Sequence, residues 1–318
     1  MTSQSWMRFF QRDAGPLGAA VALWLATAPL PAAAAGPQQQ VWLIDTSAAQ
    51  CAGGLEAGFQ QIAFWQLDPQ DPCRWRRTDA EALGRSDPLP TVIFLPGYNT
   101  GPDAAIQEAN ALRCDLEREA AGRPLRLVIW AWPSQRDRQS RLRQDVQMKA
   151  CECGAEGYFL ARTLSRLPAG APLGLVGYSY GARIACGALA LLGGSPSAGA
   201  SLPQEARAAW TAVPRPVRVL FVAAAMDADS LACGENCLAT VQRAAATVDC
   251  RDRVLRLYTR LYGRGGPPAL GGVGPIAEPS GKLRLIDVSC AVGKKHDWYR
   301  YESAVTQTLA WYAFLAGE

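Results

Sequence analysis

The sequence has no long run of charge of one sign, no repeated segment and almost no histidine. Its 32 basic and 28 acidic residues leave a formal net charge of only +4, so the concentrated positive charge of a nucleic-acid-binding protein is missing. We therefore expect no nucleic-acid partner. The absence of a fixed repeat excludes solenoid and propeller architectures. A zinc site would have to compete for the single histidine, His296, and we expect no metal or other cofactor.

Only one apolar run approaches the length of a membrane span, and it lies at the N-terminus. Two arginines precede the run from Pro16 to Leu30, and small residues follow it. This order is typical of a secretory signal, so we expect cleavage near Ala35, removing residues 1–35, and an exported single domain at 36–318. A retained anchor is the alternative, but the run is interrupted by glycine, threonine and proline and is short against the ~20 residues of a span. We expect no stable membrane span after cleavage.

The cysteines agree with export. All ten lie after the proposed cleavage point, and an even number in an oxidising compartment favours disulfides. Spacing suggests the pairs Cys51–Cys73, Cys233–Cys237 and Cys250–Cys290, although it does not fix the connectivity. We expect no metal role for Cys151 and Cys153, because the sequence offers them no second pair of cysteines.

Strand-like and helix-like segments alternate along the chain. Apolar and β-branched runs predict strands at 41–44, 62–67, 91–95, 125–131, 173–176, 217–222, 246–248 and 283–288. The first two strands resemble an antiparallel pair. Helical patterns follow the next three strands, at 103–119, after a turn at Pro133-Ser134 in a stretch that ends near Leu167, and at 182–192. This alternation predicts an α/β fold with a mostly parallel central sheet and helices on both faces, and places a site at the carboxyl ends of the strands.

A serine motif lies at one of these strand ends. The segment Gly177-Tyr-Ser-Tyr-Gly181 fits G-x-S-x-G and falls between a predicted strand and a predicted helix, which is the context that a nucleophile turn requires. Larger side chains at Gly177 and Gly181 would collide with the neighbouring strand and helix, so glycine permits the tight turn. Ser179 is therefore the candidate nucleophile. An ordinary turn serine is the alternative.

A serine hydroxyl needs an adjacent base, and the chain offers one imidazole for this role. His296 follows the strand at 283–288, in the Ser–acid–His order of hydrolase folds. The acid is less sharply defined. Asp252 follows the strand at 246–248, while Asp227 and Asp229 follow the preceding strand and are the next candidates. For Asp252, a surface ion pair with a neighbouring arginine is the alternative role.

The loop after the strand at 91–95 is the candidate second half of an oxyanion hole. There Pro96-Gly-Tyr-Asn99 stands where many hydrolases carry His-Gly. The backbone N–H groups of Tyr98 and Tyr180 would supply the two donors, with Gly97 allowing a close approach.

With these motifs in place, the sequence resembles the α/β-hydrolase superfamily over nearly the whole predicted mature chain. More narrowly, it looks like uncharacterised hydrolase-like proteins related to the family called DUF900. The resemblance is carried by the segments Phe94–Asn99, Ile129–Ser134, Gly177–Arg183, Cys250–Val254, Asp287–Ser289 and His296–Trp298. It implies a triad of Ser179, Asp252 and His296 and adds weight to Asp252. Two residues depart from the pattern, Pro96 before the glycine and Arg251 before the acid.

These features predict a serine hydrolase that cleaves an ester, or else a thioester or amide, through an acyl-enzyme. The substrate would be a small-molecule or cell-surface ester. Two alternatives remain open, a catalytically inactive hydrolase-fold binding protein at the cell surface and an acyltransferase. Only 24 residues, 193–216, separate the nucleophile helix from the next strand, which leaves no room there for a large cap domain. We therefore expect an open cleft lined by Tyr98, Tyr178, Tyr180 and Trp298, suited to short or medium acyl groups.

Overall fold

A computed structural model describes residues 39–231, 237–262, 266–277 and 280–312. The proposed signal segment at 1–35 lies outside these ranges. Within them, every helix is too short or too polar to span a bilayer.

The core of the domain is a nine-stranded sheet with the order β3-β2-β1-β5-β4-β6-β7-β8-β9. The strands are β1 (Gln40–Asp45), β2 (Ala63–Asp68), β3 (Asp71–Thr78), β4 (Thr91–Leu95), β5 (Arg126–Ala131), β6 (Leu173–Tyr178), β7 (Val217–Val222), β8 (Arg243–Val248) and β9 (Leu283–Asp287). β1 pairs with β2 and β2 with β3 in antiparallel fashion, and every other pairing is parallel. The predicted opening antiparallel pair and mostly parallel sheet are confirmed.

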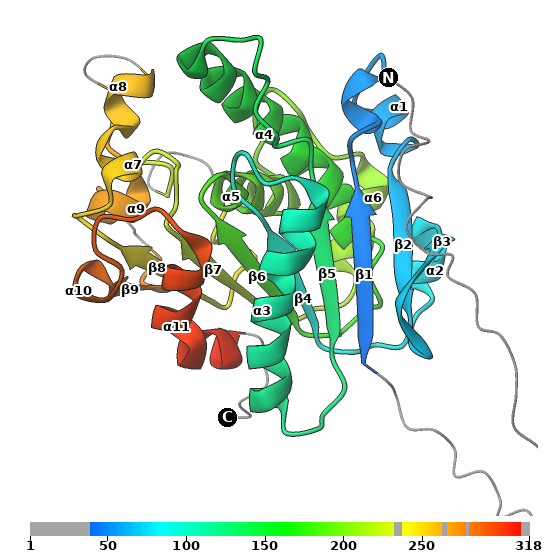
Figure 1. Ribbon diagram of the computed structural model, residues 1–318. Helices are drawn as coiled ribbons and strands as arrows, with labels where there is room; N and C mark the ends of the chain where they lie inside the picture. Colours follow the sequence, from blue (N-terminus) through cyan, green and yellow to red (C-terminus); the bar gives the residue numbers. More distant parts are fainter. Residues whose placement is uncertain (1–38, 232–236, 263–265, 278–279, 313–318) are drawn as a thin grey trace, which may run out of the picture. The chain divides into compact units, whose positions relative to one another are not determined.

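Helices cover both faces of this sheet (Figure 1). The described helices are the short 3-10 turn Ala49–Cys51, α1 (Leu55–Phe59), α2 (Ala80–Gly84), α3 (Pro102–Ala120), α4 (Leu142–Leu164), α5 (Tyr180–Leu192), α6 (Gln204–Thr211), α7 (Arg253–Arg256), α8 (Tyr258–Tyr262), α9 (Leu270–Val273), α10 (Ser289–Val292) and α11 (Trp298–Tyr312). α3 and α11 pack against each other on one face, and α4 and α5 pack against each other on the other face, where Glu156 of α4 contacts Trp130 of β5 directly.

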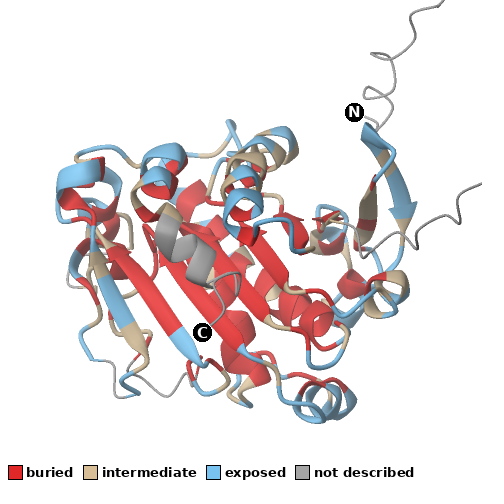
Figure 2. Cartoon of the chain, turned by 90° about the horizontal axis from the view of Figure 1, so that it is seen from below, coloured by how far each residue is buried: buried red, intermediate tan, exposed pale blue. Residues whose placement is uncertain are grey.

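Burial divides the central strands from the edge strands (Figure 2). Every residue of β4, β5, β6 and β7 is buried, as expected for parallel strands that are covered on both faces and read as continuous apolar runs. β3 is almost entirely exposed and carries three arginines, so it has no apolar pattern and was not predicted from the sequence. It forms by pairing with β2.

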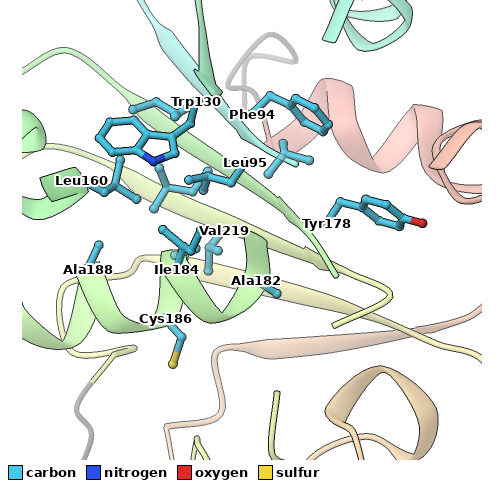
Figure 3. Packing of buried hydrophobic residues seen from close by; sticks show 14 of the residues in the cluster. Phe94, Leu95, Trp130, Leu160, Tyr178, Ala182, Ile184, Cys186, Ala188 and Val219 are labelled. Atoms are coloured by element: carbon cyan, nitrogen blue, oxygen red, sulfur yellow. The ribbon is translucent and has the colours of Figure 1, made fainter. Parts of the chain in front are cut away.

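This architecture is the α/β-hydrolase fold, with the unit β6–turn–α5 in the middle of the sheet and no large cap domain among the described residues. α5 is apolar on all sides, and Arg183 is its only residue that is not fully buried. Figure 3 shows Ile184 and Ala188 of α5 packed near Leu160 of α4 and Val219 of β7. A helix that is apolar all round needs cover on every side. The sheet and α4 cover α5, and this packing fixes the position of the turn at its start.

Candidate active site

Ser179 occupies the turn between β6 and α5 in a strained conformation. Its φ is +53° and its ψ −112°, a region that residues other than glycine rarely adopt. Hydrogen bonds on both sides hold the turn. The Ser179 amide donates to Val222 O at 2.8 Å, and the Ser179 carbonyl accepts from the Ala225 amide at 3.2 Å. The turn thus lifts the Ser179 side chain out at the carboxyl end of the sheet.

The two motif glycines are required by close contacts on either side of this turn. A Cβ added at Gly177 would lie 2.7 Å from backbone atoms of Gly181 and Ala182 at the start of α5. A Cβ at Gly181 would lie 1.9 Å from the Leu95 carbonyl oxygen at the end of β4. Backbone atoms cannot yield cheaply, so only glycine fits at both positions.

The structure brings His296 between Ser179 and Asp252. Nε2 of His296 lies 3.0 Å from Ser179 Oγ, and Nδ1 lies 2.7 Å from Asp252 Oδ2. The three residues come from the ends of β6 and β8 and from the loop before α11, and they are separated by up to 117 positions in sequence. The Tyr178 ring stacks on the imidazole with centroids 5.4 Å apart. The imidazole therefore bridges the serine and the carboxylate through its two nitrogens.

Asp252 is fully buried and uses both of its carboxylate oxygens. Oδ1 accepts the amides of Val254 and Leu255 at 2.8 and 3.1 Å and so caps the start of α7. Burial alone would raise the pKa of this carboxyl, but the hydrogen bonds from His296, Tyr301 and Leu255 outweigh it and leave the pKa below its usual value. Asp252 is therefore ionised at neutral pH.

The other candidate acids lie elsewhere. Asp227 accepts a hydrogen bond from the Tyr258 hydroxyl at 2.6 Å and lies 3.9 Å from Arg183. No hydrogen bond or ion pair joins Asp229 to the imidazole in the described structure. Asp252 has the histidine as a side-chain partner, at hydrogen-bond distance, rather than a neighbouring arginine.

Sequence reasoning missed Tyr301, on α11. Its hydroxyl donates to Asp252 Oδ2 at 2.8 Å and lies 3.5 Å from Asp249 Oδ2, and its side chain is fully buried. Asp249, also buried, accepts the amides of Arg251 and Asp252 and so shapes the turn that carries the acid. Nothing in the spacing of these residues marks them, because the contacts form only when α11 packs on the sheet.

The loop of the predicted oxyanion hole lies beside the serine. A Cβ at Gly97 would come within 3.1 Å of Ser179 Cβ, which measures how closely this loop approaches. Trp132 Nε1 donates to the Pro96 carbonyl at 3.0 Å, and the Asn99 amide donates to Ser134 O at 2.7 Å. In the described turns, the Asn99 and Ala182 amides donate hydrogen bonds to backbone carbonyls. The Tyr98 and Tyr180 amides donate none there.

A cleft of about 460 Å³ opens at this point. Tyr98, Tyr178, Tyr180 and Trp298 all line it, together with Ser179 and His296. The sequence did not indicate its outer wall, which is built by residues of α4, α7 and α8 that include Leu142, Val146, Val254, Leu257, Tyr258, Leu261 and Tyr262. The lining is thus mainly apolar and aromatic, as in sites that bind small organic molecules.

One acidic side chain in the cleft stands apart from Ser179, His296 and Asp252. Glu108 of α3 lines the cleft, and its Oε2 is buried without a hydrogen-bond partner among the described residues. Burial, with a smaller contribution from the charge of Asp297, raises the pKa of Glu108 to about 7. At neutral pH this carboxyl is therefore protonated in a large fraction of molecules and can donate a hydrogen bond.

Among the described residues, neither Cys51–Cys73 nor Cys250–Cys290 forms a disulfide. Cys51, Cys73, Cys250 and Cys290 carry free thiols, and Cys233 lies outside the described residues. The Cys250 amide donates to Ser289 Oγ at 3.2 Å, so the segments that carry Cys250 and Cys290 adjoin. Disulfide pairing stays a prediction. Among the described residues, no group of three or more His, Cys, Asp or Glu side chains is arranged to hold a metal ion.

Comparisons with known proteins add little to this geometry. No protein-family model matches the chain, and no curated protein matches its sequence, so the narrower resemblance to DUF900-related proteins stays a prediction. Among solved structures, the matches include two inhibited forms of esterase B from Lactobacillus rhamnosis, described as C6-C4 SN3 inhibited and C4-C4 SN3 tributyrin phosphonate inhibited. Both are 13% identical with a TM-score of 0.36, and the matches cover 88% and 87% of each chain. A likeness of this degree carries no argument, and the fold rests on the strand order and the β6–turn–α5 unit.

Proposed function

We propose that this protein is a serine hydrolase that cleaves an ester, or else a thioester or amide, through an acyl-enzyme. One observation carries the proposal. His296 lies within hydrogen-bond distance of both Ser179 Oγ and the buried carboxylate of Asp252, at 3.0 and 2.7 Å. A nucleophile, a base in contact with it and a third group that orients the base are the parts that serine hydrolysis needs.

In the first half of the reaction, Ser179 Oγ attacks the substrate carbonyl carbon while its proton passes to His296 Nε2. Asp252 accepts a hydrogen bond from the Nδ1–H group and stabilises the imidazolium that forms, while remaining ionised itself. The carbonyl oxygen becomes an oxyanion, and the amides of Tyr98 and Tyr180 are the proposed donors to it. When the tetrahedral intermediate collapses, His296 gives its proton to the leaving alcohol, and the acyl group remains on Ser179.

In the second half, a water molecule gives a proton to His296 and attacks the acyl carbonyl. The second intermediate releases the carboxylic acid and returns the proton to Ser179 Oγ. An alcohol in place of water would yield a new ester, which is the acyltransferase alternative. The mainly apolar cleft of about 460 Å³ suits a short or medium acyl group.

Labelling with a fluorophosphonate probe tests the proposal, because only an activated serine reacts with it. The wild-type protein should be labelled and should hydrolyse a soluble short-chain ester, and Ser179→Ala should lose both properties. Ser201→Ala, at an exposed position outside the site, is the matched control and should keep them. A folded wild-type protein that neither reacts with the probe nor cleaves any ester would overturn the proposal in favour of a binding protein.

We also propose that the chain is exported and that residues 1–35 are removed. The support is the order of charged, apolar and small residues at the N-terminus. Expression of the full chain, followed by fractionation and N-terminal sequencing, should recover an exported form that begins near residue 36. An uncleaved chain in the membrane fraction would show instead that the segment is a retained anchor.

A further inference from the structure

Three apolar side chains at the mouth of the cleft remain open to solvent. Leu142 at the start of α4 is 49% exposed, and Val254 and Leu257 at α7 are each 44% exposed, although all three also line the cleft. They come from two segments that are far apart in sequence. The contact between these segments is direct, because Arg143 Nε and Gln147 Nε2 both donate to the Leu261 carbonyl, at 3.2 and 2.7 Å.

The same two segments are rich in arginine. The segment that leads into α4 carries four exposed arginines, Arg136, Arg138, Arg141 and Arg143. Against these four arginines the segment carries one exposed acidic residue, Asp137, which accepts hydrogen bonds from the Ser140 hydroxyl and the Gln139 amide. This segment therefore presents an excess of positive charge beside Leu142.

The segment 251–260, which contains Asp252 and α7, is also rich in exposed arginine. Its exposed arginines are Arg251, Arg253, Arg256 and Arg260, and its acidic residue, Asp252, is buried against His296. None of the arginines in the two segments forms an ion pair with a described carboxylate. We call these arginines, together with Leu142, Val254 and Leu257, the cleft rim. The cleft rim thus gathers eight exposed arginines, although the whole chain has a net charge of only +4.

Unpaired like charges repel one another, and exposed apolar side chains order water, so the cleft rim is unfavourable in isolation. A bilayer that contains anionic lipids relieves both costs. Its headgroups attract the arginines, by about 1 kcal/mol for each basic residue near the surface, and its interfacial region accepts leucine and valine side chains. A soluble polyanion would neutralise the arginines but would leave the apolar residues in water.

We propose that the cleft rim docks this protein on the surface of a bilayer containing anionic phospholipid, with the mouth of the cleft facing the lipid. The start of α4 and the helices α7 and α8 lie beyond the carboxyl ends of the strands (Figure 1), so docking through them places the cleft at the headgroup level. The location of the reacting serine rests on the proposed hydrolase function. The docking itself needs no catalysis, and it can be measured with Ser179→Ala.

The test is co-sedimentation of Ser179→Ala protein with vesicles of phosphatidylcholine, with and without phosphatidylglycerol. Binding should require phosphatidylglycerol and weaken as salt is raised. Each arginine replaced should weaken binding about fivefold, the factor that corresponds to about 1 kcal/mol. Arg138→Gln/Arg141→Gln and Arg253→Gln/Arg256→Gln should therefore each lose about 25-fold, which is two such factors.

The matched control is Arg74→Gln/Arg85→Gln, which removes two exposed arginines near β3, at the other edge of the sheet. It should bind like the parent. Leu142→Ser/Leu257→Ser should weaken vesicle binding while leaving binding to soluble heparin unchanged. Equal binding to pure phosphatidylcholine, equal losses in control and rim variants, or vesicle binding unaffected by the leucine variant would each overturn the proposal, the last in favour of a soluble polyanion.

Discussion

The hydroxyl of Tyr301 and the imidazole of His296 share one oxygen atom of Asp252. The hydroxyl donates to Oδ2 at 2.8 Å, and Nδ1 of the imidazole lies 2.7 Å from the same atom. Since the tyrosine lies on α11 and the acid follows β8, this contact joins α11 to the proposed triad. Tyr301 does not reach the serine, so it is a positioning residue.

We expect Tyr301→Phe to lower the free energy of unfolding at neutral pH by about 1.5 to 3 kcal/mol, the usual worth of a hydrogen bond to a charged group. The hydrogen bond helps to hold the pKa of Asp252 below its usual value. Its stabilisation is therefore present above the unfolded pKa and is lost as the pH falls through the folded pKa. Urea titrations at several pH values should show a difference between variant and wild type that shrinks in acid. A constant difference would mean that the tyrosine acts only through packing.

Replacing either end of the proposed proton path should abolish hydrolysis without unfolding the protein. Ser179→Ala and His296→Ala should each remove nearly all turnover, and the double variant should be little worse than either, because triad members act as a unit. Turnover of a soluble ester and circular dichroism would be measured together. If Ser179→Ala kept more than about a tenth of the rate, Ser179 would not be the nucleophile.

The acid can be tested separately from the base. Asp252→Asn should reduce turnover by about 10⁴-fold, by analogy with the serine protease triad, because an amide favours the wrong imidazole tautomer. Asparagine also caps helices well, so the start of α7 should persist. Asp227→Asn and Asp229→Asn are the comparison variants and should change turnover little. The reverse ranking would move the acid to the residues after β7.

A buried carboxyl outside the cleft should contribute to the pH dependence of stability. Glu156 is fully buried and accepts hydrogen bonds from Thr46, Gln50 and Trp130. Burial nevertheless raises its pKa from 4.5 to about 7. The native state then holds a proton that the unfolded state has released, so the stability from this group is present below about pH 4.5 and declines as the pH rises toward 7.

The free energy of unfolding of the wild type should fall by up to about 3 kcal/mol between these pH values through this group alone. Glu156→Gln should flatten that part of the profile, even though it weakens the hydrogen bonds. Glu119→Gln, at an exposed position on α3, should leave the slope as it is. Parallel slopes for wild type and Glu156→Gln would show that this carboxyl stays ionised in the native protein.

The cleft should favour short or medium acyl chains. Its outer wall consists of the start of α4 and the short helices α7 and α8, and no large cap domain covers it among the described residues. Soluble short-chain esters should therefore be cleaved faster than emulsified long-chain ones. Little activity on short chains with a sharp rise on long-chain emulsions would indicate a cover that moves at the lipid–water interface.

The sequence was informative where local patterns decide the structure. Continuous apolar runs identified the buried parallel strands, and G-x-S-x-G placed on strand–turn–helix indicated Ser179. The single histidine narrowed the choice of base. The choice of Asp252 as the acid also rested on the resemblance to α/β-hydrolases, because local spacing does not rank the aspartates between Ser179 and His296 strongly. There are five of them, Asp227, Asp229, Asp249, Asp252 and Asp287.

The features that were missed depend on contacts between distant segments. β3 has charged residues where a strand pattern would be apolar, and it exists because β2 offers it hydrogen bonds. Helices α7 and α8 are only four and five residues long, too short for a helical period to be recognised. Tyr301 is one of nine tyrosines, and only the packing of α11 distinguishes it.

The divided use of Asp252 has a consequence for how this protein can change. One carboxylate oxygen caps the start of α7, and the other contacts His296. A single side chain therefore supports both a helix of the cleft wall and the orientation of the proposed base. Altering substrate range through Val254 therefore risks the reaction rate, whereas Leu142 and Val146 lie on α4, which makes no hydrogen bond to Asp252 or His296 in the described structure. Directed evolution of new substrate preferences should accumulate its tolerated changes on α4 first, and lineages that alter α7 should need compensating changes around the acid.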